Sequence, residues 1–259
     1  MKIHQCLTKY YSSICLLAKN ENDYINEWLE WHLNKLKFDH VYIYDNESSI
    51  PIEMSIDDKY KNKITFLTWD RRDYKFIMQN ECYKHFLNNF STENTWTAFI
   101  DADEFIRLVD CDEDNINDFL LNYEDANALY IEWTMYNANG QYMKTEGLVR
   151  DRFKNTIYYP HDAYSGKCII KPSEYNYMGP HYPFKCKTIS KMVDSNKKLM
   201  KITNNNINVP KDKIVVDHYF TKSYEEWCEK LGRGSCNTLK RKLDEFFKLN
   251  PDMNPKEVK

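Results

Sequence analysis

The first hundred residues alternate between short apolar runs and segments of helical spacing, and this alternation constrains the fold more than any other feature. Apolar runs typical of buried strands lie at residues 11–17, 41–44, 63–69 and 95–100. Segments with the apolar spacing of a helix lie at residues 25–36 and 74–90. The order strand, helix, strand, strand, helix, strand predicts an α/β fold with a mostly parallel, Rossmann-like sheet flanked by helices.

The second half of the chain carries weaker signals. Strand-like runs lie at residues 128–133, 168–171 and 214–216, and two helices are expected at 224–231 and 236–249. The two helices predict a C-terminal helical segment. Because no linker or repeat divides the chain, we expect a single domain over residues 1–250, followed by a tail over residues 251–259.

Composition excludes several classes of function. The chain of 259 residues has a formal net charge of −3, so it lacks the basic field that holds nucleic acid. The run at residues 14–18 is only five residues long, whereas a membrane span needs about 20 apolar residues. We therefore expect no transmembrane segment, and at most weak peripheral association with the inner membrane surface. The eight cysteines form no C-x-x-C pair, which indicates free thiols and a cytoplasmic location.

Polar side chains follow three of the predicted strands, at the point where each strand ends. These clusters are Lys19-Asn20-Glu21, Asp45-Asn46 and Asp101-Ala102-Asp103. Ligands of parallel α/β sheets bind beyond the carboxyl ends of the strands. The sequence therefore predicts a functional site at this edge of the sheet.

Asp101 and Asp103 are the main candidates for chemistry. In a strand, residues two apart lie on one face, about 6.5–7 Å apart. Two carboxylates about 5 Å apart repel by roughly 3 kcal/mol at an effective dielectric of about 20. If no counter-charge is present, a divalent cation would remove this cost, and oxygen ligands suit Mg²⁺ or Mn²⁺ bound together with substrate phosphates. The alternative is a solvated acidic corner.

Several longer motifs resemble glycosyltransferase family 92 and the family 2-like group. They are K-N-E-x-x-Y-I-x-E-W-L-x-W-H at residues 19–32, D-H-V-Y-I-Y-D-N-x-S at 39–48, F-I-D-A-D-E-F at 99–105, K-C-I-I-K-P at 167–172 and H-Y-x-x-K-S-x-x-E-W-x-x-K-x-x-R-G at 218–234, with Gln79 and Trp133 between them. In this order and spacing, the matches extend over nearly the whole chain.

The resemblance implies a type A glycosyltransferase fold, a nucleotide-sugar donor and a divalent metal at the D-x-D motif. It also implies a donor half over residues 10–110 and an acceptor half with the closing metal and phosphate motif over residues 111–235. Asp103 would bind the metal, with Asp101 contacting the ribose or the metal shell. His218 would be a further metal ligand.

The same resemblance implies the residues that bind the donor. Asn20 and Glu21 would lie beside the nucleotide, and Asp45 would contact its base. Lys222 and Arg233 would meet the phosphate charge. Read without the resemblance, Asp45 serves equally well as a turn residue and His218 as a structural histidine.

An inverting reaction, as in the family 2-like enzymes, needs a base that takes the proton of the acceptor hydroxyl. Glu132, Asp162 and His181 are candidates, and no spacing singles one out. The interpretation is a metal-dependent transfer of a sugar from a nucleotide donor, with UDP-linked sugars favoured, to a glycan or glycoconjugate hydroxyl.

Two alternatives stay open. A nucleotidyltransferase also needs acids and a metal at strand ends, but it would normally carry a glycine-rich loop where this chain has Ala18-Lys19-Asn20-Glu21. A non-catalytic carbohydrate-binding or scaffold protein on the same fold is the other alternative. The intact pair of Asp101 and Asp103 argues against it.

Overall fold

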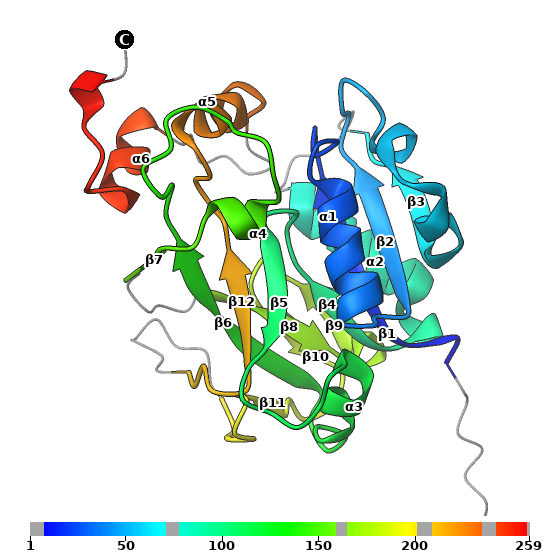
Figure 1. Cartoon of the computed structure of the whole chain (residues 1–259). Coiled ribbons are helices and arrows are strands. Elements are labelled where there is room, and N and C mark those ends of the chain that lie inside the picture. The colour runs from blue at the N-terminus through cyan, green and yellow to red at the C-terminus, as the bar shows by residue number, and fades with distance from the viewer. Residues whose placement is uncertain (1–7, 71–77, 159–164, 201–208, 235–241, 258–259) are drawn as a thin grey trace, which may run out of the picture.

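A computed structural model describes residues 8–70, 78–158, 165–200, 209–234 and 242–257. Its main sheet has the strand order β3-β2-β1-β4-β8-β6-β12-β5, with β7 and β11 also paired to β6 (Figure 1). The strands are β1 (Tyr10–Ala18), β2 (His40–Asp45), β3 (Ile64–Thr68), β4 (Asn94–Phe99), β5 (Glu104–Leu108), β6 (Ala128–Tyr136), β7 (Thr156–Ile157), β8 (Gly166–Ile170), β9 (Tyr175–Met178), β10 (Pro183–Cys186), β11 (Met192–Val193) and β12 (Ile214–His218). β9 and β10 form a separate hairpin.

The α-helices are α1 (Ile25–Leu29), α2 (Met78–Phe90), α3 (Ile116–Leu121), α4 (Val149–Arg152), α5 (Tyr224–Gly232) and α6 (Leu243–Leu249). The segment expected as one helix over 25–36 begins as α1 and continues as a π-helix, η1 (Glu30–Lys35). Short 3₁₀ helices are η2 (Ile52–Ser55), η3 (Asp58–Lys63), η4 (Ser91–Glu93), η5 (Pro172–Glu174) and η6 (Pro255–Glu257). Residues 74–77 and 236–241 of the expected helices lie outside the described part of the chain.

The α/β fold predicted from the sequence is confirmed, and its first half is the parallel part. β1 pairs in parallel with β2 and β4, and β2 pairs in parallel with β3. The second half is mixed, because β8 is antiparallel to both of its neighbours, β4 and β6, and β5 is antiparallel to β12. β5 follows β4 after four residues, which is too short for the crossover that a parallel connection requires.

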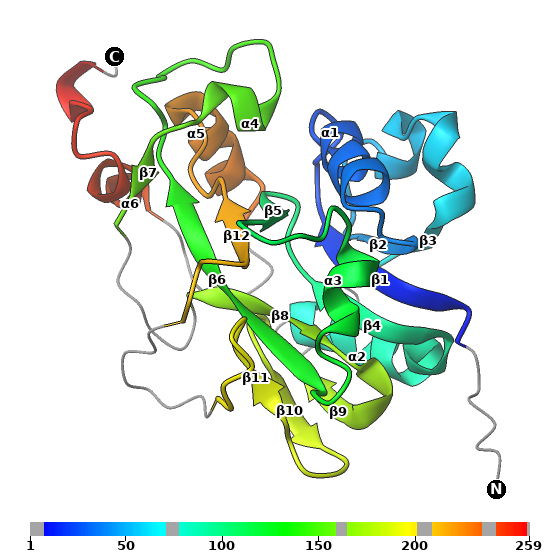
Figure 2. The ribbon, with the colours of Figure 1, turned by 60° about the horizontal axis from the view of Figure 1, so that its bottom comes forward.

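Helices cover both faces of the sheet (Figures 1 and 2), and a hydrophobic core lies on each face. On one face, Trp28 of α1 and Phe119 of α3 belong to the same core as Ile14 of β1. On the other face, Phe86 of α2 belongs to a core with Cys15 of β1. Successive residues of a strand point to opposite faces, so the continuous apolar run in β1 serves both cores.

A third, smaller core joins the C-terminal helices to the end of β6. It contains Trp227 of α5, Phe246 of α6 and Ala138. This packing fixes α5 beyond the end of β12, at the edge where the polar clusters lie (Figure 1). Among the described residues, no helix is long and apolar enough to cross a bilayer.

Candidate functional site

The three polar clusters meet at one edge of the sheet, at the carboxyl ends of neighbouring strands. Ala18 at the end of β1 is in register with Asp45 at the end of β2. Asp103 lies in the turn between β4, the other neighbour of β1, and β5. Its backbone carbonyl accepts a hydrogen bond from Tyr219 at 2.9 Å, which ties this turn to the end of β12. The late motif around residue 218 is thereby brought to the D-x-D turn.

Two buried or half-buried side chains hold the carboxylate of Asp101. Gln79 Nε2 donates to Asp101 Oδ1 at 2.8 Å, and Lys167 Nζ lies 2.7 Å from Oδ2. The side chain of Lys167 is 1% exposed. Both oxygens of Asp101 are thus engaged by protein donors.

Glu104 follows the D-x-D motif and is fully buried. Its Oε2 accepts from the backbone N–H of Asp101 at 2.8 Å and lies 3.4 Å from Lys167 Nζ. Burial raises the pKa of Glu104 to about 8, although Lys167 opposes the shift. Lys167 therefore serves two carboxyl groups at once.

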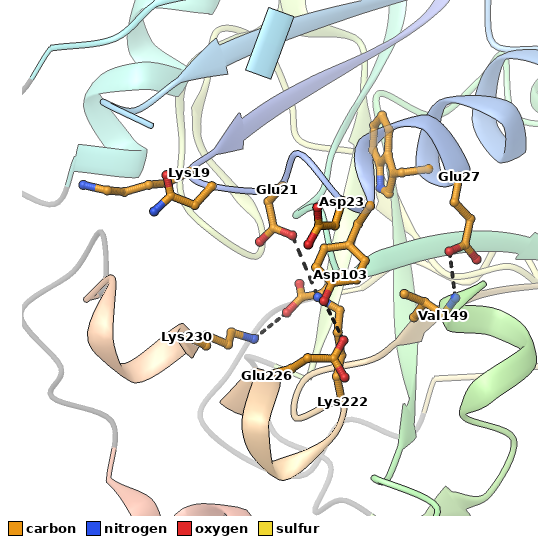
Figure 3. Close-up of polar contacts among 12 residues, drawn as sticks. Lys19, Glu21, Asp23, Glu27, Asp103, Val149, Lys222, Glu226 and Lys230 are labelled. Carbon is orange, nitrogen blue, oxygen red and sulfur yellow. Dashed lines mark hydrogen bonds and ion pairs between the residues drawn. The ribbon is translucent and has the colours of Figure 1, made fainter. Parts of the chain in front are cut away.

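Asp103 lies between a lysine and a histidine. Its Oδ2 is 2.5 Å from Lys230 Nζ (Figure 3). Its Oδ1 is 3.6 Å from His218 Nε2. Burial alone would raise the pKa of Asp103, but the charges of Lys230, His218 and Lys222 hold it well below the usual range. Asp103 is therefore an ionised carboxylate at neutral pH.

Each acid of the D-x-D motif has a lysine as its counter-charge, Lys167 for Asp101 and Lys230 for Asp103. The condition under which the pair alone would favour a cation, that no counter-charge is present, is not met. These lysines come from β8 and α5, which follow the motif by 66 and 127 residues. Repulsion between the two acids is therefore not by itself an argument for a metal.

His218 bridges two acidic side chains at the end of β12. Its Nε2 faces Asp103, and its Nδ1 lies 3.9 Å from Glu104 Oε1. Both His218 Nδ1 and Glu104 Oε1 are buried, and neither has a hydrogen-bond partner among the described residues. Burial lowers the pKa of His218 in spite of the nearby Asp103, so the imidazole is neutral at pH 7 and has a lone pair to offer.

Two side chains of the site, Asp103 and His218, can ligate one divalent cation together. Two ligand atoms that each lie about 2.1 Å from one cation are at most about 4.2 Å apart, and Asp103 Oδ1 and His218 Nε2 satisfy this limit at 3.6 Å. Glu104 lies behind His218, 3.9 Å from its Nδ1, on the side where an acidic group commonly orients a ligating histidine. In the part of the chain that the structure describes, no group of three potential ligands occurs. Substrate phosphate and water would have to complete the shell, as is usual for Mg²⁺.

A pocket of about 240 Å³ adjoins Asp103. Its lining residues are Asn20, Tyr24, Phe220, Thr221, Lys222, Glu226, Glu229, Lys230 and Arg233. Two of them, Asn20 and Lys222, have left-handed backbone conformations with φ of 53° and 51°. Such conformations are costly for residues other than glycine and concentrate at functional sites.

Glu21 connects the two cations that were predicted to meet phosphate. Lys222 Nζ lies 3.8 Å from Glu21 Oε2 (Figure 3). Arg233 Nη1 lies 2.5 Å from Glu21 Oε1. Arg233 also donates to the backbone carbonyl of Lys19 at 2.7 Å. The structure therefore brings Asn20, Glu21, Lys222 and Arg233 together, as the resemblance implied.

A buried ion pair supports the wall of the pocket. Arg152 of α4 contacts Glu226 of α5 through both of its terminal nitrogens, at 3.1 and 2.5 Å. Tyr24 donates to the same carboxylate at 2.6 Å. Lys222 Nζ lies 4.0 Å from the centroid of the Tyr24 ring. The pair thus fixes the position of α5 relative to the loop after β1.

Asp45 makes the contacts of a turn residue. Its Oδ1 accepts from Ser48 N at 3.1 Å, and its Oδ2 accepts from Ile52 N at 2.9 Å. Asn20 accepts from Ser49 N at 2.8 Å and so joins the loops after β1 and β2. Contact of Asp45 with a nucleotide base stays a prediction.

Of the three candidate bases, the structure describes two, His181 and Glu132, and both lie beside Gly166 of β8. His181 donates through Nδ1 to the carbonyl of Gly166 at 3.1 Å, and burial lowers its pKa to about 4. Trp133 packs against both His181 and His218, with ring centroids 5.3 and 4.5 Å away. Glu132 is buried in β6, in register with Gly166 of β8. Asp162 lies outside the described residues.

No role was predicted from the sequence for Lys167 or Lys230, although both belong to motifs of the resemblance. The sequence nevertheless indicates a buried position for each lysine. Lys167 directly precedes the apolar run Cys168-Ile169-Ile170, and Lys230 lies three residues after the core residue Trp227 on the same helix. A lysine at a core-facing position requires an anionic partner.

The fold and the site define an α/β protein that presents acids, a neutral histidine and a cationic pocket at the carboxyl edge of its sheet. The model of glycosyltransferase family 92 matches residues 9–247. The chain therefore belongs to glycosyltransferase family 92, which confirms the resemblance and the enzyme class. Among curated proteins, no sequence matches this one.

Solved structures with some similarity include S. aureus TarS in complex with UDP-GlcNAc, at 16% identity and a TM-score of 0.43, over 92% of this chain and 64% of that one. HddC from Yersinia pseudotuberculosis has 11% identity and a TM-score of 0.39, over 68% of this chain and 83% of that one. Glucosyl-3-phosphoglycerate synthase from Mycobacterium tuberculosis, in complex with Mn²⁺ and UDP, has 13% identity and a TM-score of 0.32, over 49% of this chain and 44% of that one. The chain spans less than two thirds of the TarS chains that it matches.

Proposed function

We propose that this protein transfers a sugar from a nucleotide-sugar donor, with UDP-linked sugars favoured, to a hydroxyl of a glycan or glycoconjugate. The reaction inverts the anomeric centre and depends on Mn²⁺ or Mg²⁺. The observation that carries the proposal is the pair Asp103 and His218 beside a pocket lined by Lys222, Lys230 and Arg233. Family membership supplies the class of reaction.

Charge balance in the site supports metal dependence. The acids are Glu21, Asp101, Asp103 and Glu104, and the cations that pair with them are Arg233, Lys222, Lys167 and Lys230. Because Glu104 has a pKa of about 8 and is mostly protonated at neutral pH, these four cations face only three carboxylates, and the site carries a net charge of about +1. The diphosphate of a nucleotide sugar carries about two negative charges, so a divalent cation that binds with it would supply the remaining positive charge. Asp103 and His218 would hold that cation, which supplies Lewis-acid stabilisation of the departing diphosphate.

The residues of this chain would divide the work of transfer. The bond from the anomeric carbon to the diphosphate oxygen breaks, and a bond to the acceptor oxygen forms. Lys222 and Arg233 would neutralise the charge that develops on the diphosphate. The acceptor proton passes to a base, for which Glu132, Asp162 and His181 remain the candidates.

The proposed donor contacts are those that the resemblance to family 92 implies. Asn20 and Glu21 would lie beside the nucleotide, and Asp45 at the end of β2 would contact the base. The oxygens of Asp101 are engaged by Lys167 and Gln79, so we assign Asp101 to the ribose rather than to the metal. The donor half over residues 10–110 then supplies most nucleotide contacts, and the acceptor half over residues 111–235 supplies His218, Lys222 and Arg233.

The proposed setting is a single domain in the cytoplasm that acts on a soluble acceptor, or on a lipid-linked one at the inner membrane surface. Membrane contact would be peripheral and weak, since the net charge of −3 offers no overall attraction to anionic lipid.

Turnover of donors tests the proposal. UDP-, GDP- and CDP-linked sugars are each incubated with the protein and Mn²⁺, and release of free nucleotide is measured. We expect release from one nucleotide class, UDP first, and its loss in Asp103→Asn. The matched control is Asp39→Asn, because Asp39 is also a hydrogen-bonded carboxylate, accepting from the backbone N–H groups of Tyr11 and Ser12, but it lies at the other end of β1. Release that is equal in Asp103→Asn and wild type would overturn the assignment.

A further inference from the structure

Lys230 occupies an unusual position for a pocket residue. Its Nζ lies 2.5 Å from Asp103 Oδ2 and 2.7 Å from the backbone carbonyl of Phe220, and 4.3 Å from the centroid of the Phe220 ring. The side chain is 8% exposed, yet it lines the pocket together with Lys222 and Arg233. The ammonium group is thus on the boundary between the acid site and the pocket.

The position of Lys230 conflicts with a second cation on the same carboxylate. Asp103 offers its Oδ1 toward His218 and its Oδ2 to Lys230. An ammonium and a divalent ion on the two oxygens of one buried carboxylate would repel each other strongly. In contrast, Arg233 and Lys222 pair with Glu21 and do not compete for Asp103.

We propose that Lys230 is an exchangeable counter-ion of Asp103. In the ligand-free site it neutralises the carboxylate, and when a divalent cation takes over Asp103 it turns its ammonium into the adjoining pocket and onto the diphosphate of the donor. The flexible four-carbon side chain of a lysine permits this movement, and the pocket of about 240 Å³ gives it room. The inference rests on the proposed function and adds a positioning role for Lys230.

The exchange predicts effects of opposite sign for one substitution. Lys230→Gln removes the charge and keeps a donor for the Phe220 carbonyl. Because the competing cation is gone, Mn²⁺ without nucleotide should bind at least about tenfold more tightly than to wild type. Because the pocket has lost one cation, UDP in saturating Mn²⁺ should bind about tenfold more weakly. If Lys230 only maintained the fold, its replacement by Gln would not strengthen Mn²⁺ binding.

The first experiment is calorimetric titration of Mn²⁺ alone, and of UDP in saturating Mn²⁺, into wild type, Lys230→Gln, Lys230→Arg and Arg233→Gln. Lys230→Arg keeps the charge and should bind Mn²⁺ like wild type. Arg233→Gln changes the same pocket by the same charge, so it should weaken UDP binding and leave Mn²⁺ binding unchanged. Unchanged or weaker Mn²⁺ binding by Lys230→Gln would overturn the exchange.

A second measurement uses only the wild-type protein, in case Lys230→Gln does not fold. Acetylation of Lys230 by a lysine-reactive ester is followed by mass spectrometry. Mn²⁺ alone should release the ammonium and increase its labelling rate several-fold, and UDP added with Mn²⁺ should protect it again. Labelling of Lys230 that does not respond to Mn²⁺ would refute the proposal. If the wild type binds no nucleotide at all, the proposed function fails instead, and the two failures are thereby distinguishable.

Discussion

His218 lies 3.6 Å from Asp103, measured from Nε2 to Oδ1, and its other ring nitrogen faces the buried acid Glu104. The histidine therefore connects the D-x-D turn to the end of β12, and burial keeps its imidazole neutral at pH 7. This relationship makes the late histidine a metal ligand in our account.

We expect His218→Ala to weaken Mn²⁺ binding by about 10- to 100-fold, since the protein offers only two ligands in the described part of the chain. Calorimetry with Mn²⁺ checks this. The matched control is His181→Ala, because His181 packs on the same indole ring of Trp133 but points to the carbonyl of Gly166. Equal losses in both variants would mean that His218 only packs the core.

Asp45 has a structural role whether or not it also contacts the donor. Asp45→Ala should destabilise the protein by about 1–3 kcal/mol, because two backbone N–H groups lose their acceptor. It should also lower the affinity for UDP by about tenfold. Urea unfolding and UDP titration measure the two effects separately.

Asp39→Ala is the control for this change, since it also removes an acceptor of two backbone N–H groups. It should lower stability without altering UDP affinity. If Asp45→Ala and Asp39→Ala both bind UDP as tightly as wild type, Asp45 is a turn residue only.

The buried pair of Arg152 and Glu226 should make stability depend on acid pH. Burial alone would raise the pKa of Glu226, but hydrogen bonds from Arg152, Ser223 and Tyr24 lower it from 4.5 to about 2. The stabilisation from this ionised group is complete above about pH 4.5 and is lost as the pH falls toward 2.

Glu226→Gln should therefore be about 3 kcal/mol less stable than wild type at neutral pH, and the gap should close as the pH falls toward 2. Urea unfolding at several pH values measures the gap. Glu53 is exposed, so Glu53→Gln serves as the control and should have the same stability as wild type at each pH. A gap that stays constant with pH would contradict the assigned charge of Glu226.

Lys167 should contribute substantially to the stability of the folded protein, although it lies at the edge of an apolar run. Lys167→Met leaves the buried Glu104 and the half-exposed Asp101 without their cation and should cost about 3 kcal/mol of stability. Adding Asp101→Asn to that variant should recover part of the loss, because one uncompensated charge is removed. Stability that falls further in the double variant would show that Lys167 is not the counter-charge of Asp101.

Local patterns were sufficient to predict the first half of the fold. The runs at residues 11–17 and 41–44 became β1 and β2 with boundaries one residue longer at each end, and each polar cluster followed its strand as expected. The position of a strand and of its end depends on residues that are close in sequence, and hydrophobic periodicity reports these directly.

The partners of the acids could not be predicted in the same way. Lys167 reaches Asp101 across 66 residues, and Lys230 reaches Asp103 across 127, through pairings of β8 and α5 that depend on the whole sheet. The antiparallel insertion of β8 between β4 and β6 was missed for the same reason. The local spacing of Asp101 and Asp103 carries no information about the distant lysines that neutralise them.

The central claim is that Asp103, His218 and the cationic pocket together bind a nucleotide diphosphate with a divalent cation. Calorimetric titration of UDP, GDP and CDP into the purified protein, first with Mn²⁺ and then with EDTA, tests it most directly. The account predicts micromolar binding of one nucleotide, UDP first, and its loss in EDTA. If no nucleotide binds under either condition, the claim is contradicted, and the fold would remain without the proposed donor site.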